Sequence, residues 1–130
     1  MNSLEMCAGA GGQTLGLERA GFEHEALVEW EPPACSTLRL NRPHWNVIEG
    51  DLGQFDARPF KSIDLVAGGV PCPPFSKAGR QLGAEDERDL FPQAVRVVDA
   101  ISFRVALIKY GRRILKAIFK NRLGAGIEYA

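Results

Sequence analysis

The sequence is poor in cysteine and histidine and contains no long apolar run. Its 130 residues include three cysteines and two histidines, whose spacing forms neither a disulfide framework nor a recognisable metal-binding pattern. No segment approaches the roughly 20 consecutive apolar residues that a membrane-spanning helix requires, and no basic segment followed by an apolar stretch begins the chain. These absences argue against a disulfide-rich secreted domain, a structural zinc site and a membrane protein. We therefore expect a cytoplasmic protein in a reducing compartment.

The sequence also lacks net charge, although the two signs are unevenly distributed. Residues 1–100 carry 9 basic and 15 acidic side chains, whereas residues 101–130 carry 7 basic and 1 acidic. A basic end could approach phosphates. Apolar residues at helical spacing interrupt this end, namely Ile114, Leu115, Ile118 and Phe119. Since that pattern is typical of an amphipathic helix with a solvated face, we favour this interpretation and predict a helix over Arg112–Leu123.

The rest of the chain predicts one compact α/β domain. Short strand-like runs alternate with longer helical patterns, without repeats or low-complexity tracts, which indicates successive βαβ units and a mainly parallel sheet. Strands are expected at Ser3–Met6, Glu25–Glu29, Asn46–Glu49, Ile63–Ala67 and Val105–Ile108. Helices are expected at Gln13–Ala20, Pro33–Asn41 and Phe91–Ile101. The long Gly- and Pro-rich stretch Gly68–Asp89 is predicted to be a functional loop.

A glycine-rich segment follows the first predicted strand and precedes the first predicted helix. It reads Cys7-Ala8-Gly9-Ala10-Gly11-Gly12. Glycines let the backbone turn sharply and let a ligand approach the N-terminus of the helix. A dinucleotide-binding fingerprint would have a further glycine three residues after Gly11, where this chain has Thr14. The pattern therefore favours S-adenosylmethionine over NAD.

Acidic and aromatic residues follow the second and third predicted strands. Glu29-Trp30-Glu31 lies about 20 residues past the first glycine, where an acidic side chain can accept hydrogen bonds from ribose hydroxyls. Trp30 could cover a face of an adenine ring, and Asp51 could accept its amino group. Taken singly, each residue is explained as well by an ordinary core, rim or turn position. Because parallel strands end at one edge of a sheet, together they predict a nucleoside site.

A cysteine framed by prolines follows the fourth predicted strand, in the segment Val70-Pro71-Cys72-Pro73-Pro74. Prolines restrict the loop, so the Cys72 sulfur can be presented with little ordering entropy, and we predict that it is a nucleophile. No nearby base supports acyl transfer, whereas attack on an electron-poor ring remains open. A redox role would need a second, resolving cysteine close by. Cys35 is expected to be structural, and Cys7 to border the cofactor.

Five segments in this order resemble the cytosine-5 DNA methyltransferase family: Cys7–Gly12, Glu29–Glu31, Gly50–Asp51, Gly69–Ser76 and Asp86–Phe91. The Pro-Cys segment is the most specific of them. The resemblance implies the Rossmann-like sheet of S-adenosylmethionine-dependent methyltransferases and makes Cys72 the catalytic thiolate. It further implies that S-adenosylmethionine is held by Cys7, Gly9, Gly11, Gly12, Glu29, Trp30, Asp51, Leu52 and Leu90.

The resemblance also implies a mechanism. The target cytosine leaves the duplex, because its ring carbons cannot be attacked within the base stack. Cys72 then adds to C6, which raises the electron density at C5 so that this carbon takes the methyl group. Loss of the C5 proton and release of the thiolate restore the ring.

The chain departs from the family pattern in two respects. Where the family has Glu-Asn-Val after the fifth strand, this chain has Lys109-Tyr110-Gly111, and losing a positioned acid typically costs about 100- to 10,000-fold in rate. The chain also stops soon after that strand, without later motifs or a target-recognition region. We expect residues 1–130 to form a single, incomplete catalytic domain that is truncated after about five strands. Its exposed sheet edge should favour oligomerisation or a partner chain.

Two functional hypotheses follow. The first is a DNA (cytosine-5-)-methyltransferase of a restriction-modification system, acting on DNA with a second polypeptide that supplies the later motifs. The second is a non-catalytic, truncated relative that at most binds S-adenosylmethionine. Lys109 and the early stop motivate the second hypothesis, whereas Cys72 beside a complete set of cofactor motifs motivates the first.

Overall fold

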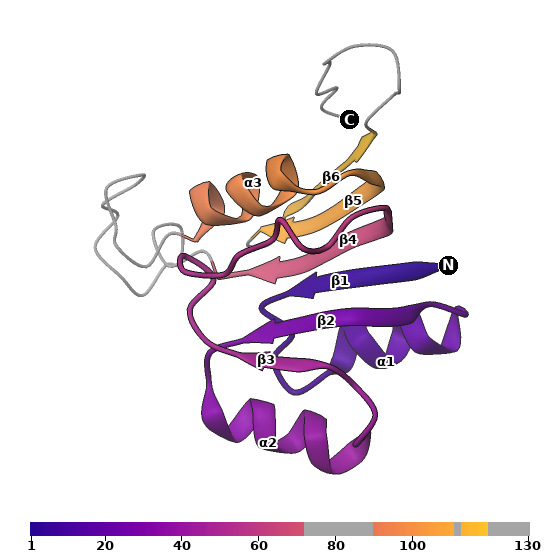
Figure 1. Ribbon diagram of the computed structural model, residues 1–130, viewed down its shortest axis with the longest axis vertical. Coiled ribbons are helices and arrows are strands. Elements are labelled where there is room, and N and C mark those ends of the chain that lie inside the picture. The colour runs from indigo at the N-terminus through magenta and orange to yellow at the C-terminus, as the bar shows by residue number, and fades with distance from the viewer. Residues whose placement is uncertain (72–89, 111–112, 120–130) are drawn as a thin grey trace.

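A six-stranded sheet forms the centre of the computed structural model, which describes residues 1–71, 90–110 and 113–119 (Figure 1). The strand order is β3-β2-β1-β4-β5-β6. The first five strands are parallel and the sixth is antiparallel to β5. The strands are β1 Asn2–Met6, β2 Glu23–Glu29, β3 Val47–Glu49, β4 Ile63–Val70, β5 Phe103–Tyr110 and β6 Arg113–Phe119. The predicted mainly parallel α/β sheet is therefore confirmed.

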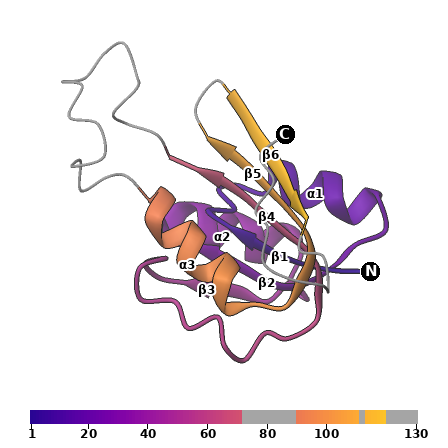
Figure 2. The ribbon, with the colours of Figure 1, turned by 90° about the horizontal axis from the view of Figure 1, so that it is seen from above.

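Three helices connect the parallel strands, as predicted: α1 Gly12–Arg19, α2 Pro32–Asn41 and α3 Phe91–Ala100. Figure 2 shows α3 and α1 on opposite sides of the sheet. Gly21, with φ +88°, ends the first helix region, and the Gly21 N–H donates to the Glu18 carbonyl. This is the left-handed glycine that commonly terminates helices. Within the described ranges, no helix is long and apolar enough to cross a membrane.

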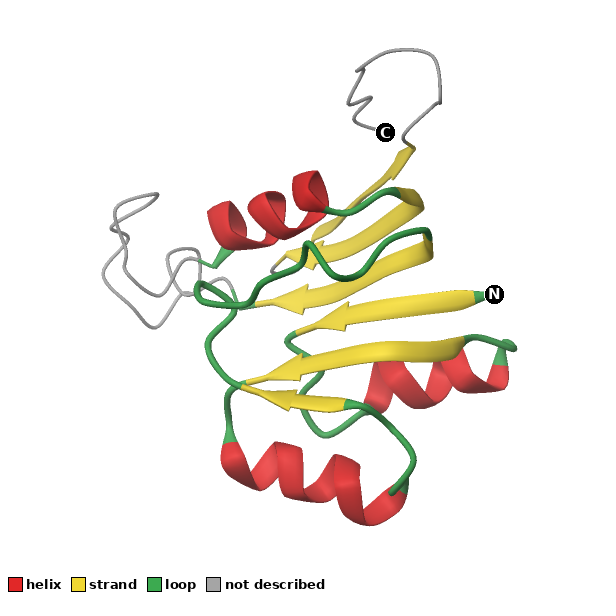
Figure 3. Ribbon diagram, in the orientation of Figure 1, coloured by secondary structure: helices red, strands yellow, loops and turns green. Residues whose placement is uncertain are grey.

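The larger of two hydrophobic clusters lies between the sheet and α3. Strand residues such as Leu4, Met6 and Val66 pack there against Val97 and its neighbours on α3. The connection from β3 to β4 has no helix or strand, and Figure 3 shows it crossing the sheet. It adds buried residues to this cluster, namely Leu52, Phe55 and Ala57. A smaller cluster contains Ala8, Leu27, Leu38 and Trp45.

The helix predicted over Arg112–Leu123 is wrong, because Arg113–Phe119 forms strand β6, paired antiparallel with β5. The apolar spacing there fits a helix, but isoleucine and phenylalanine also favour strands, and a strand at this position pairs with the N–H and C=O groups that the edge of β5 would otherwise leave without partners. The edge expected to be exposed on the fifth strand is accordingly covered. The predicted loop also begins later, since β4 extends to Val70.

Candidate cofactor site

The glycine turn between β1 and α1 has a left-handed backbone at three positions. The φ angles of Cys7, Gly9 and Gly11 are +54°, +56° and +94°. A Cβ added at Gly9 or Gly12 would meet nothing within 4 Å, whereas one at Gly11 would lie 2.8 Å from Leu38 Cδ2. Gly11 is therefore required for packing and backbone conformation. Gly9 and Gly12 instead leave space at the N-terminus of α1, where backbone N–H groups favour polar or anionic ligand atoms.

We expect Gly11→Ala to destabilise the fold by roughly 2–4 kcal/mol, because it combines a left-handed backbone with overpacking against Leu38. The matched change Gly16→Ala lies within α1, where a Cβ meets nothing within 4 Å. That control should stabilise the protein by roughly 0.5–1 kcal/mol. Urea unfolding of both variants measures the difference. Equal stabilities would contradict our explanation of Gly11.

Glu29 ties the end of β2 to the glycine turn. Its side chain is buried, and its carboxylate accepts three backbone hydrogen bonds. Oε2 accepts from the Gly9 N–H at 2.7 Å, and Oε1 accepts from the N–H groups of Trp30 and Glu31, both at 2.9 Å. Oε2 thus carries one hydrogen bond from the described residues and keeps a further lone pair. The predicted ribose acceptor therefore also has a structural role as a brace, which means that its hydrogen bonds hold the glycine turn against the end of β2.

Backbone hydrogen bonds join the ends of β1, β2 and β3. The Ala8 N–H donates to the Val28 carbonyl at 3.2 Å, and the Gly50 N–H donates to the Glu29 carbonyl at 2.9 Å. The side chain of Trp30 next to these bonds is 65% exposed. The predicted meeting of three strand ends is therefore confirmed, while the contact of Trp30 with an adenine ring stays a prediction.

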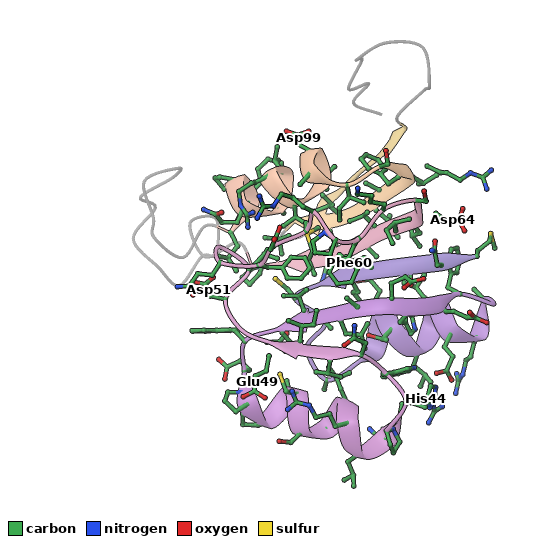
Figure 4. All side chains as sticks on the ribbon, viewed as in Figure 1. His44, Glu49, Asp51, Phe60, Asp64 and Asp99 are labelled. Atoms are coloured by element: carbon green, nitrogen blue, oxygen red, sulfur yellow. The ribbon has the colours of Figure 1, made fainter. Side chains whose placement is uncertain are left out.

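Asp51 presents an available carboxylate oxygen at the same edge. Its Oδ1 accepts the Gly53 N–H at 2.8 Å, and its Oδ2 accepts no hydrogen bond from the part of the chain that is described. Figure 4 shows Asp51 at the opposite end of the sheet from Asp64. The next residue, Leu52, is buried in the core and anchors the turn. Leu90 is half-buried at the start of α3 and packs against the same core.

The two cysteines within the described residues lie in surroundings that disfavour a reactive thiolate. Cys7 is half-buried, and its burial together with the Glu29 charge raises the pKa of its thiol to about 11, so the thiolate is scarce at neutral pH. Cys35 is buried in α2, and its Sγ donates to the Glu29 carbonyl at 3.4 Å. The structural role predicted for Cys35 is confirmed. The contact of Cys7 with cofactor stays a prediction.

The predicted nucleophile, Cys72, lies outside the described residues. The preceding residue, Pro71, is exposed directly after β4. In that strand Gly68 pairs with Met6, the last residue of β1, so the two strands end at the same edge of the sheet. Pro71 therefore lies at the edge that carries the glycine turn.

Lys109 stands at this edge as well. It pairs in register with Gly69 of β4, two residues before Pro71, and its side chain is exposed. Lys109 therefore lies beside the end of β4. That Lys109 takes the place of the glutamate implied by the resemblance stays a prediction.

Two charged side chains that contact other elements of the fold were not predicted. Glu5, in the middle of β1, is buried beside Thr14 of α1. A carboxylate within an apolar strand was a visible signal for it. Arg96 of α3 binds backbone carbonyls of the turn after Asp51. Sequence alone gave no signal for Arg96, because its partners are backbone atoms from a distant loop.

Comparison with known proteins supports the family resemblance found in the sequence. The C-5 cytosine-specific DNA methylase family matches residues 1–107. The Type II methyltransferase M.NgoMIV of Neisseria gonorrhoeae is 61% identical over 119 residues, which cover 92% of this chain and 38% of that protein. The Type II methyltransferase M.Eco47II of Escherichia coli is 48% identical over 114 residues, covering 86% of this chain and 27% of that protein.

A solved structure agrees with the sequence relatives. A prophage-encoded E. coli protein described as a DNA modification methyltransferase superimposes with a TM-score of 0.69 at 28% identity. The match covers 83% of this chain and 31% of that chain. The chain therefore spans less than half the length of these relatives. It belongs to the C-5 cytosine-specific DNA methylase family, whose cofactor is S-adenosyl-L-methionine.

Proposed function

We propose that this chain is the cofactor-binding and nucleophile-bearing part of a DNA (cytosine-5-)-methyltransferase that forms a covalent bond from Cys72 to C6 of cytosine. The observation that carries the proposal is the meeting of four strand ends at one edge of the sheet. The glycine turn, Glu29 and Asp51 lie there, and β4 ends at the same edge, two residues before Cys72 in the sequence.

The described residues fit S-adenosylmethionine. The open side of Gly9 and Gly12 leaves room beside the N-terminus of α1. The remaining lone pair on Glu29 Oε2 suits a ribose hydroxyl, and the available Asp51 Oδ2 suits the adenine amino group. Trp30, Leu52, Leu90 and Cys7 would line the rest of the site. When bound, the cofactor supplies an activated methyl group on a sulfonium.

The chemistry that we assign to this chain is nucleophilic. Cys72 adds as a thiolate to C6 of a cytosine that has left the base stack, which makes C5 electron-rich. After C5 has been methylated, its proton is lost and the C6–sulfur bond breaks, returning the electron pair to the cysteine. Because proline fixes its own backbone φ, the prolines that flank Cys72 in the sequence are expected to reduce the entropy lost when the sulfur meets the ring.

DNA is the proposed substrate, and a second polypeptide is the proposed partner. The chain corresponds to 38% of M.NgoMIV and 27% of M.Eco47II, so large parts of those relatives have no counterpart in it. Base-specific recognition needs side chains that reach a DNA groove, and none can be named among the residues that the structure describes. We propose that a partner supplies target recognition and the later motifs.

A trapping experiment tests the proposed function. The chain is mixed with the part of M.NgoMIV that lies beyond the matched segment, S-adenosylmethionine and DNA containing 5-fluorocytosine. The fluorine blocks the proton loss that releases the thiolate, so we expect a protein–DNA adduct that survives denaturation. Cys72→Ser should lose the adduct completely while binding the cofactor as before.

The position of Lys109 favours an alternative, in which the chain binds the cofactor without catalysing transfer. A lysine cannot hold or transfer a proton as a carboxylate does at that position. Saturable S-adenosylmethionine binding in calorimetry without any adduct would support this alternative. Absence of cofactor binding would contradict both.

A further inference from the structure

Arg96 of α3 binds the turn that carries Asp51. Its Nη2 donates to the carbonyls of Leu52 at 2.7 Å and Gly53 at 3.3 Å, and its Nη1 donates to the carbonyl of Phe55 at 3.2 Å. The Nε donates to Gln93 Oε1 at 3.1 Å, which holds the guanidinium plane on its own helix. The Arg96 side chain thus binds three carbonyls that lie more than 40 positions earlier in the chain.

The turn has few other hydrogen bonds, because it lies in a connection without helix or strand. Within it, the Gln54 N–H donates to the Asp51 carbonyl at 3.0 Å, and the Phe55 N–H donates to the Leu52 carbonyl at 3.3 Å. Asp51 Oδ1 accepts the Gly53 N–H. The Gly53 N–H that binds the Asp51 carboxylate belongs to the peptide whose carbonyl, that of Leu52, accepts from Arg96, and the carbonyl of the next peptide, that of Gly53, accepts from Arg96 as well.

We propose that Arg96 is a positioning residue for the nucleobase end of the cofactor site. It does not touch Asp51 and acts through the backbone of Leu52 and Gly53. By fixing that backbone against α3, it keeps Asp51 Oδ2 directed toward the position of the adenine amino group. This inference rests on the proposed function, since it assigns Asp51 to the cofactor.

Arginine suits this role better than lysine. A planar guanidinium carries five N–H donors in a fixed arrangement and can serve several carbonyls at once, whereas an ammonium is a compact charge on a flexible chain. Arg96→Lys should therefore restore part of the binding that Arg96→Met loses. If residue 96 contributed only apolar packing through the aliphatic part of its side chain, methionine would serve equally well.

The test measures binding of two ligands to the full chain by calorimetry. One is S-adenosylhomocysteine, and the other is its analogue whose purine lacks the 6-amino group. We expect Arg96→Met to weaken S-adenosylhomocysteine binding by about 10-fold, the effect of roughly one misplaced hydrogen bond. Binding of the deaminated analogue should change by less than about twofold. The ratio of the two affinities in one variant does not depend on the fraction of folded protein.

Two further variants make the result specific. In Asp51→Asn the Arg96→Met change should add little further loss, because both act on the same contact. Arg104→Met is the matched control: Arg104 is an exposed arginine on β5 whose Nη1 lies 3.4 Å from Asp64 Oδ1, at the other end of the sheet. It should leave both affinities unchanged.

The outcomes separate the inference from the function on which it rests. Failure of the unaltered chain to bind S-adenosylhomocysteine would refute the cofactor site and the role of Arg96 with it. The inference alone would be overturned if the unaltered chain bound S-adenosylhomocysteine normally and Arg96→Met changed neither affinity. The same holds if Arg96→Met weakened the binding of both ligands equally.

Discussion

Glu29→Gln is expected to lower the free energy of unfolding by roughly 2–4 kcal/mol, because hydrogen bonds to a charged acceptor contribute roughly 1.5–3 kcal/mol each. The buried carboxylate accepts from the N–H groups of Gly9, Trp30 and Glu31. A glutamine of the same shape can accept with one end only, so its NH2 group must face a backbone N–H. Urea unfolding measures the loss of stability.

The same change should weaken S-adenosylmethionine binding at least about 100-fold, since it disturbs the glycine turn and removes the proposed ribose acceptor. Glu31→Gln is the matched control, because Glu31 is exposed and its carboxylate accepts no hydrogen bond from the described residues. That control should change stability by less than about 0.5 kcal/mol. If the two variants behaved alike, Glu29 would not be the brace that the structure indicates.

Stability should also depend on pH through Glu5. Burial raises the pKa of this carboxyl from 4.5 to about 7, against the opposing effect of the Thr14 hydroxyl. The folded state therefore binds the proton more tightly than the unfolded state. The stabilisation is complete below pH 4.5 and is lost as the pH rises through 7. Between pH 5 and 8 this should cost about 2–3 kcal/mol.

Glu5→Gln removes this titration, so the stability of the variant relative to the unaltered chain should rise by the same amount between pH 5 and 8. The difference isolates Glu5 from His24, whose pKa is lowered by burial and whose protonation destabilises the fold toward acid pH. Glu23→Gln, at an exposed position of β2, is the control. Its difference in free energy of unfolding from the unaltered chain should not change between pH 5 and 8. A flat difference for Glu5→Gln would refute the assignment.

The sheet and the glycine turn could be predicted because they follow from local chemistry. Short apolar runs, glycines after Met6 and a proline near the start of α2 each have one dominant structural meaning. The acidic residues after β2 and β3 could then be placed at one edge, since parallel topology brings the ends of the strands together. The hydrogen bond from the Gly9 N–H to Glu29 bears out that placement.

What could not be predicted depends on contacts between distant segments. The spacing of Ile114, Leu115, Ile118 and Phe119 suits a helix, yet the free edge of β5 selects a strand. Local periodicity cannot register the presence of such an edge. Arg96 was missed for a related reason, because carbonyl groups are present in every residue and carry no signature in the sequence.

The hydrogen bonds of Glu29 fix the glycine turn before a ligand binds. The left-handed conformation of Gly9 is held by a carboxylate oxygen that still has a lone pair for a hydroxyl group. A nucleoside can therefore enter without breaking the existing bond, and the loop loses little conformational entropy on association. Such preorganisation predicts nearly identical backbone positions before and after occupancy, with affinity changes among variants appearing mainly as faster dissociation.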